Sequence, residues 1–148
     1  MSSIIREVEL KDKELLTELM YAYIVGFYGK PRPDVAKIHR LISNLHHEQG
    51  GIQFVVETEG QLIGFATLYF AWSTMRADPI TIMNDLFLLA PFRGTAVEEA
   101  LFRHCQNYTK EHGYAYMSWI TGRDNVRAQA FFDQMGATRT DWVNYSIR

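Results

Sequence analysis

The sequence predicts one α+β domain over residues 1–148, in which helices cover the faces of a central sheet. A chain of 148 residues suits a single hydrophobic core. Two helical patterns follow the first strand pattern, so the order differs from the simple alternation of a doubly wound nucleotide-binding fold. Two later strand patterns flank Thr58-Glu59-Gly60-Gln61, a glycine-containing turn of hairpin length, which makes those strands antiparallel.

The N-terminal half contains a strand and two amphipathic helices. Residues 4–8 form a short apolar segment, and Asp12 stands at the cap position of the helix that follows. Apolar residues recur at helical spacing up to Gly26, and a Gly/Pro-rich stretch at 29–33 then breaks the chain. Asp34 opens the second helix, whose apolar positions run to residue 45 and which Gly50-Gly51 ends.

The second half begins with three strands, after which helices and strands follow in turn, and each element is bounded by turn residues. The expected order is strand 52–57, strand 62–72, a polar loop at 73–79, strand 80–89, helix 97–112, strand 114–121, helix 125–134 and strand 137–147.

Composition narrows the class of protein. The chain is 47% hydrophobic and 14% aromatic, and its 15 Lys and Arg against 17 Asp and Glu give a formal charge of −2, with no basic run. These values disfavour disorder and a nucleic-acid partner. The start of the chain does not read as a signal peptide and no apolar run is long enough for a membrane span, so we expect a cytoplasmic location and no membrane partner.

Neither the lone cysteine nor the histidines indicate a metal site. Cys105 cannot form an internal disulfide, and it reads as a packed small residue rather than a nucleophile. His39, His46 and His47 lie on the second helix without metal-ligand spacing, which favours a solvated helix face.

A short segment from Arg93 to Glu98 connects an apolar strand to an amphipathic helix. Such a turn places unpaired backbone N–H groups at a helix N-terminus, where the helix dipole also favours an anion. Arg93 adds a forked cation suited to phosphate. An ordinary strand-to-helix turn, with Thr95 as a plain helix cap, is the simpler interpretation.

In order and spacing, this segment resembles motif A of the GNAT acetyltransferases, in which Arg/Gln-x-x-Gly-x-Gly/Ala holds the pyrophosphate of acetyl-CoA. The run from Asn125 to Ala137 is similar to the GNAT C-terminal signature Asn-x-x-Ala-x-x-x-Tyr-x-x-x-Gly-Phe/Ala. With the element order, the resemblance covers nearly the whole chain. It implies a three-layer GNAT fold with about four helices and a mixed, mostly antiparallel, twisted sheet whose central strands splay.

The resemblance also implies an N-acetyltransferase that uses acetyl-CoA as co-substrate and needs no metal. The pantetheine of the cofactor would pair with main-chain groups of the strand before the turn. The implied cofactor-binding residues are Leu86, Phe87, Leu88, Arg93, Gly94, Thr95, Ala96, Val97, Glu98, Asn125, Ala128 and Phe132.

Three residues depart from the family pattern. Ala96 replaces a glycine, which is tolerated if its φ stays negative. Glu98 replaces a small residue, and a carboxylate that points inward would compete for the anion site. Phe132 stands where the family commonly has a tyrosine that protonates the leaving thiolate, and a phenyl ring has no proton to give. Tyr116 and Tyr145 are conceivable substitutes, although a packed ring is the simpler account of each.

The diamine acetyltransferase branch is the nearest resemblance, through Asn84-Asp85 and through Gly136-Ala137 with Asp141-Trp142. Asp85 would orient or deprotonate the amine, as the catalytic residue, unless it only pairs with an Arg or caps a loop. The expected substrate-binding residues are Asn84, Asp85, Tyr28 and Trp119.

The aromatic residues of the N-terminal helices are open to two interpretations. Tyr21, Tyr23, Phe27 and Tyr28, together with Trp72 and Trp119, either line a cation-binding pocket or belong to the core. A small-molecule amine is the expected partner, and a homodimer is possible. The competing function is a GNAT-fold module that binds acyl-CoA or a protein and no longer transfers.

Overall fold

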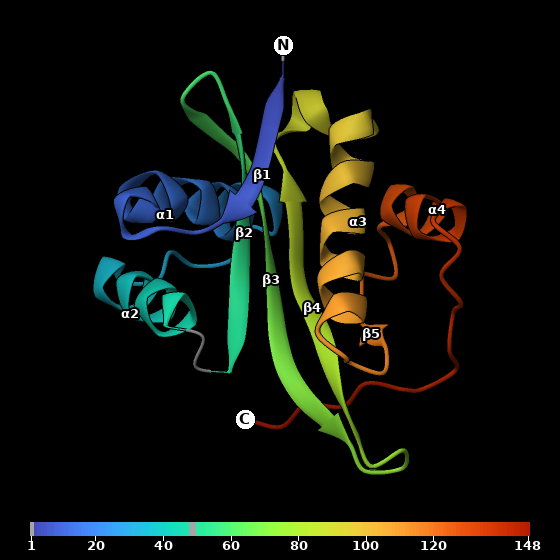
Figure 1. Cartoon of the computed structure of the whole chain (residues 1–148). Helices are drawn as coiled ribbons and strands as arrows, with labels where there is room; N and C mark the ends of the chain where they lie inside the picture. Colours follow the sequence, from blue (N-terminus) through green and yellow to red (C-terminus); the bar gives the residue numbers. More distant parts are fainter. Residues whose placement is uncertain (1, 48–49) are drawn as a thin grey trace.

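The computed structural model describes residues 2–47 and 50–148, and it forms a five-stranded sheet between two layers of helices (Figure 1). The strands are β1 (Ser3–Glu7), β2 (Gly51–Thr58), β3 (Gln61–Ser73), β4 (Asp78–Leu88) and β5 (Met117–Ser118). They lie in the sheet in chain order. The helices are α1 (Lys13–Tyr21), α2 (Val35–His46), α3 (Ala96–Glu111) and α4 (Val126–Gln134), with shorter helical turns at Leu10–Asp12, Ala22–Phe27 and Ala90–Phe92.

The sheet is antiparallel from β1 to β4 and parallel between β4 and β5. The predicted hairpin is confirmed, since β2 and β3 pair antiparallel through the turn before Gln61. The β4–β5 pairing consists only of Thr81 with Met117 and Ile82 with Ser118. Beyond Ile82, β4 separates from the segment that follows β5, so the sheet opens toward the end of β4.

Each face of the sheet has its own apolar layer. Helices α1 and α2 bury Leu16, Ile38 and Ile42 against Val55 and Phe65 on one face. Helix α3 buries Leu101, Phe102 and Cys105 against the other face, where Phe131 of α4 joins them. Figure 1 shows these two helical layers on opposite sides of the strands.

The first helix continues beyond the predicted glycine. It passes without a break from α1 into a π-helical turn, Ala22–Phe27, that includes Gly26. Asp12 does not cap α1 with its side chain; its buried carboxylate accepts hydrogen bonds from Arg6 and from the Glu9 amide. Asp12 is thus the cap residue by position, as predicted, but its side chain makes no cap hydrogen bond, because an ion pair with β1 takes the carboxylate. The predicted end of the second helix at Gly50 lies beyond the observed end at His46, and part of that interval lies outside the described residues.

Two predicted C-terminal strands differ from the structure. Strand 114–121 is reduced to the two residues of β5, and residues 137–148 form no strand. The side chains of Trp142, Val143, Tyr145 and Ile147 are between 73% and 98% exposed. Their alternating pattern favours a strand, but a strand also needs a partner edge, and this segment pairs with none within the described chain.

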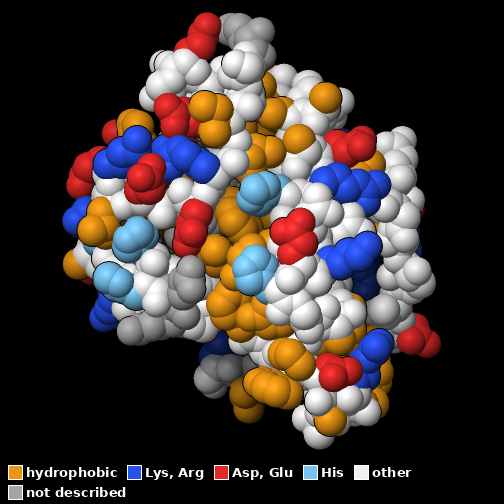
Figure 2. Space-filling model, viewed as in Figure 1, with side chains coloured by type: hydrophobic (Ala, Val, Ile, Leu, Met, Phe, Trp, Pro, Cys, Tyr) orange, Lys and Arg blue, Asp and Glu red, His pale blue; other side chains and the backbone are white. Residues whose placement is uncertain are grey.

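Hydrophobic side chains gather in the middle of one face of the molecule, between the α1/α2 layer and the α3/α4 layer (Figure 2). Acidic and basic side chains are interspersed around them rather than collected into a basic patch. In the described part of the chain, no helix is long and apolar enough to cross a membrane.

Candidate active site

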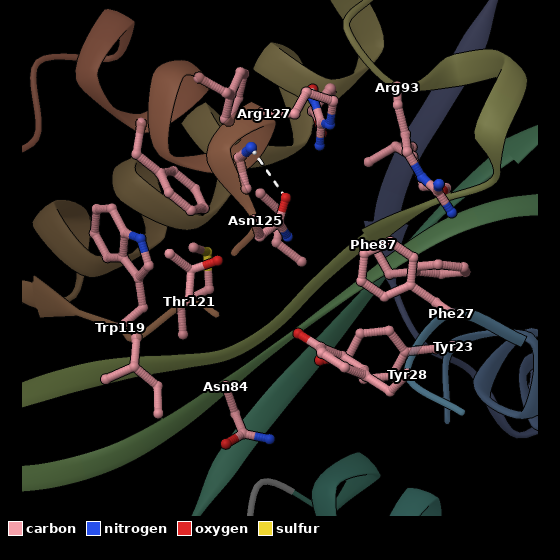
Figure 3. A pocket seen from close by; sticks show the side chains of 18 residues that line it. Tyr23, Phe27, Tyr28, Asn84, Phe87, Arg93, Trp119, Thr121, Asn125 and Arg127 are labelled. Carbon is pink, nitrogen blue, oxygen red and sulfur yellow. Dashed lines mark hydrogen bonds and ion pairs between the residues drawn. The ribbon is translucent and has the colours of Figure 1, made fainter. Parts of the chain in front are cut away.

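A cavity lies where β4 and the chain after β5 separate (Figure 3). One wall is the second half of β4, and the opposite wall is formed by Trp119, Ile120 and Thr121. The β4 wall consists of Met83, Asn84, Leu86, Phe87 and Leu88, and the remaining lining residues are Tyr23, Phe27, Tyr28, Arg93, Glu98, Asn125, Arg127, Ala128, Phe131 and Phe132. The opening of the sheet thus creates the cavity.

The turn before α3 contains a glycine in the left-handed region. Gly94 adopts a φ of 75°, which a glycine tolerates without strain. Outside glycine, the described residues with positive φ are Glu59 and Ala77, so Ala96 meets the condition set for it. The Thr95 side chain does not cap the helix; its hydroxyl donates to the Phe92 carbonyl at 2.6 Å. The N–H groups of the first turn of α3 are therefore not capped by Thr95.

Glu98 points inward. Its Oε1 accepts a hydrogen bond from the Gly94 amide at 3.0 Å, and both of its oxygens accept from Arg127 at 2.9 and 2.8 Å. The Glu98 side chain is only 4% exposed. The carboxylate thus lies at the turn to which the family resemblance assigns the pyrophosphate of the cofactor.

Arg93 connects the turn to the aromatic side of the cavity. Its Nε donates to the Leu88 carbonyl at 2.8 Å, and its guanidinium lies over the rings of Phe27 and Phe87. Burial lowers the pKa of Arg93, and the charge of Arg127 lowers it further, against the influence of Glu98. The two guanidinium groups are therefore close enough to affect each other electrostatically.

The other end of the cavity is aromatic. The Tyr23 ring packs edge-on against Tyr28 at 5.1 Å, and it lies 5.2 Å from Phe87 between ring centroids. Figure 3 shows the hydroxyls of Tyr23 and Tyr28 directed toward the open middle of the cavity, with Asn84 nearby. Of the two interpretations left open for these rings, the pocket applies to Tyr23, Phe27 and Tyr28, although Tyr23 also packs against the core residue Phe65.

The Asp85 carboxylate interacts with the Tyr23 side chain, and Asp85 is not among the described residues that line the cavity. Burial raises the pKa of Tyr23, and the nearby charge of Asp85 raises it further, as it also does for Tyr69. Asn84 Nδ2 lies 3.3 Å from both carboxylate oxygens of Asp85. No ion pair of Asp85 with an Arg is present within the described part of the chain.

Helix α4 brings the C-terminal motif to the cavity. Asn125 caps this helix, because its Oδ1 accepts the Ala128 amide at 3.2 Å, and Ala128 is buried. Phe132 packs against Trp119 with 5.1 Å between ring centroids. Every predicted site residue except Asp85, Gly94, Thr95, Ala96 and Val97 lines the cavity, and the last four form the turn before α3 and the first residues of that helix.

The proposed tyrosine substitutes lie elsewhere. Tyr145 is 89% exposed in the C-terminal segment, and Tyr116 borders a different groove beside Met117 and Met135. Neither lines the cavity. Trp72, another aromatic residue considered for a pocket, is 73% exposed at the end of β3.

Sequence reasoning missed Arg127. Its position in the first turn of α4, two residues after the capping Asn125, was the available signal, but its contact with Glu98 depends on how α4 packs against α3. Cys105 is fully buried and burial raises its pKa to about 12, which agrees with a packed residue. The second-helix histidines are not uniformly solvated, since His46 contacts the Val8 carbonyl.

The whole arrangement matches a known family. The pattern of the Acetyltransferase (GNAT) family matches residues 15–137. The chain belongs to this family, and it is an acetyl-CoA-dependent N-acetyltransferase. Five strands, four helices and a sheet that opens beside β4 agree with the fold that the sequence predicted.

Named relatives agree with this assignment. The chain is 29% identical over 145 residues to the D-amino-acid N-acetyltransferase HPA3 of Saccharomyces cerevisiae, which covers 96% of this chain and 88% of that protein. It is 27% identical over 103 residues to the uncharacterized N-acetyltransferase YhfO of Bacillus subtilis, covering 69% and 68%. The fold is also that of the aminoglycoside N-acetyltransferase AAC(6')-Iy in complex with CoA, with a TM-score of 0.84, 18% identity, and coverage of 99% and 95%.

Proposed function

We propose that this enzyme transfers the acetyl group of acetyl-CoA to a primary amine of a small molecule, by direct attack of the amine within a ternary complex. The observation that carries the proposal is the two-ended cavity. Arg93 and Arg127 stand at one end, and Tyr23, Tyr28 and Asn84 stand at the other. A polyanionic cofactor suits the first end, and a cation suits the second.

The residues present fit acetyl-CoA at the first end. Gly94 leaves open space, because a Cβ built there would meet nothing within 4 Å. Main-chain groups of β4 beyond Ile82 have no β5 partner, so those of Leu86 and Phe87 can pair with the pantetheine. The Leu88 carbonyl already accepts Arg93 Nε. Donors of the separated strand would polarise the thioester carbonyl as charge develops on its oxygen.

The second end would hold the amine. Tyr23 and Tyr28 offer hydroxyls and ring faces, and the negative charge of Asp85 lies close to the Tyr23 side chain. An ammonium group is attracted by this combination. Asp85 would then orient the amine, or take its proton through water or through the Tyr23 hydroxyl. Positioning would supply most of the rate enhancement.

Phe132 leaves the thiolate without the usual acid. The phenyl ring packs against Trp119 and Phe102 and offers no O–H. We propose that the departing thiolate takes its proton from water. Loss of general acid help typically slows such a step by about 10²- to 10⁴-fold without preventing it.

The proposal is tested by two measurements on the same protein. Isothermal titration should give saturable binding of acetyl-CoA, and thiol release should depend on an added amine. The panel should include polyamines, aminoglycosides and amino acids of both hands, since the yeast relative is named for D-amino acids and the structural neighbour for aminoglycosides. Absence of acetyl-CoA binding would refute the proposal, and binding without turnover on every amine would favour the non-catalytic alternative.

Asp85 has a matched control in the same strand. Asp85→Asn should lower kcat/KM for the amine by about tenfold or more while acetyl-CoA affinity is kept. Asp78→Asn removes an equal charge from the exposed start of β4 and should change neither value.

We also propose that residues 1–148 form one domain and that the enzyme is cytoplasmic and works as a homodimer. Its single cysteine is consistent with a reducing compartment. The exposed apolar side chains of the C-terminal segment support a second copy of the chain as partner.

A further inference from the structure

An internal carboxylate is held in the anion site of the turn before α3. Glu98 accepts one hydrogen bond from the Gly94 amide and two from the Arg127 guanidinium. A backbone amide of a glycine turn and a forked guanidinium are the donors that a phosphate group also uses. The carboxylate of Glu98 therefore imitates an anionic ligand.

The charges at this end of the cavity favour a ligand more negative than Glu98. Arg93 and Arg127 carry two positive charges against one carboxylate, and the N-terminus of α3 adds a partial positive charge. The Arg127 side chain is 47% exposed, whereas that of Glu98 is 4% exposed. The half-exposed Arg127 side chain can thus turn toward the cavity. The Glu98 carboxylate stays enclosed only as long as it has hydrogen-bond partners.

We propose that Arg127 binds the diphosphate of the cofactor by exchanging partners: it holds Glu98 in the cofactor-free enzyme and the diphosphate in the complex. In the same exchange the Gly94 amide passes from Glu98 to the diphosphate. No donor is lost, and the displaced carboxylate moves away from the anion site. Glu98 is consequently an internal competitor of the cofactor. This inference rests on the proposed use of acetyl-CoA.

The opposite arrangement makes the opposite prediction. If Glu98 kept its place and merely fixed Arg127 so that its outer edge met the diphosphate, removal of the Glu98 charge would weaken cofactor binding. Under partner exchange, removal of that charge strengthens it. The sign of the change decides between the two.

The first test is isothermal titration of CoA into the full-length protein and its Glu98→Gln variant. Because the ion pair of Glu98 with Arg127 no longer has to be broken, CoA should bind about tenfold more tightly to the variant. Pantetheine lacks the diphosphate, so its affinity should not change. Glu99→Gln is the matched control, since Glu99 lies exposed in the same helical turn and should leave both affinities unchanged.

The second test concerns Arg127. Arg127→Ala should weaken CoA binding by about tenfold or more and leave pantetheine binding unchanged, whereas Arg123→Ala, in the exposed loop before α4, should change neither. Because Arg127→Ala strands a buried carboxylate, the double variant Glu98→Gln/Arg127→Ala is also compared with Glu98→Gln alone. Loss of CoA affinity in that comparison isolates the contribution of Arg127 without an unpaired charge.

The outcomes separate this inference from the proposed function. An unchanged or weaker CoA affinity of Glu98→Gln, or a double variant that binds CoA as tightly as Glu98→Gln, would overturn the partner exchange while leaving the acetyltransferase proposal intact. If neither the wild-type protein nor any variant binds CoA, the proposed function itself fails.

Discussion

At the scale of single residues, Phe132 limits the chemistry that the cavity can perform. A phenol at this position would stand beside Trp119 in the cavity wall and could donate a proton to the leaving thiolate. We therefore expect Phe132→Tyr to raise kcat by about tenfold or more, measured as thiol release at saturating acetyl-CoA. Phe70→Tyr adds the same hydroxyl on β3, away from the cavity, and should not raise it. An unchanged kcat in Phe132→Tyr would mean that thiolate departure does not limit the reaction.

The Arg6–Asp12 ion pair links β1 to the turn before α1. Arg6 donates to both carboxylate oxygens of Asp12 at 2.7 and 2.8 Å, and this contact holds the pKa of Asp12 below its usual 3.8. A lowered folded-state pKa means that the charged pair stabilises the protein above about pH 4 and that this stabilisation is lost as the pH falls through the folded-state pKa.

Asp12→Asn should accordingly lower the free energy of unfolding by about 2 kcal/mol at pH 7 and by less near pH 3, below the unfolded-state pKa. Urea unfolding at the two pH values measures the difference. Asp34→Asn makes the same chemical change at a cap position whose side chain forms no cap hydrogen bond, so it should stay within about 0.5 kcal/mol of the wild type. An equal loss in Asp12→Asn at both pH values would contradict the role given to the ion pair.

At the scale of elements, the β3–β4 pair sets the shape of the cavity wall. Gly64 pairs with Leu88, and a Cβ at Gly64 would lie 2.5 Å from Leu88 Cδ1 and 2.8 Å from the Phe87 carbonyl oxygen. The carbonyl belongs to the backbone and can move only if β4 moves. Gly64→Ala should therefore cost about 1–3 kcal/mol of unfolding free energy and weaken CoA binding.

Gly26→Ala is the control for this substitution. Gly26 lies in the π-helical turn near the cavity, and a Cβ there meets nothing within 4 Å. Its CoA affinity should match that of the wild type, and its unfolding free energy should not fall, since Ala favours a helical position over Gly. If Gly64→Ala also kept its CoA affinity, the cofactor would not depend on the position of the end of β4.

Elements that are specified locally could be predicted from the sequence, and elements that depend on distant partners could not. The β2–β3 hairpin, α3 and the Asn125-capped α4 carry their signals in adjacent residues. The predicted strand at 137–147 has the right alternation but no partner edge within the described chain. At the site, the turn at Gly94 could be predicted from the sequence. The Glu98–Arg127 contact could not, because it joins two helices whose packing no local pattern encodes.

At the scale of the whole molecule, the C-terminal segment is the part that the fold leaves unexplained. Val143, Tyr145 and Ile147 would share one face of a strand, yet all three are exposed. Beside the two-residue edge strand β5, a groove is lined by Met117, Met135 and other apolar side chains. Figure 1 shows the segment running away from α4 rather than back along β5. In a dimer, the C-terminal segment of each copy would bind in the groove of the other copy.

Removal of residues 141–148 tests this arrangement. The cut keeps Arg139, which pairs with Asp133 of α4 at 2.9 Å, so the fold of each copy should survive with little change in melting temperature at low concentration. We expect light scattering after size exclusion to give a dimer for the full chain and a monomer for the shortened one. The reason is that burial of the exposed apolar side chains of this segment away from water stabilises the dimer. Tyr145→Ser with Ile147→Ser should act in the same direction, whereas Asn144→Ser with Ser146→Thr, on the alternate face, should leave the dimer intact. A full-length chain that is monomeric at every concentration would remove the dimer from the proposal, and a shortened chain that remains dimeric would place the contact elsewhere.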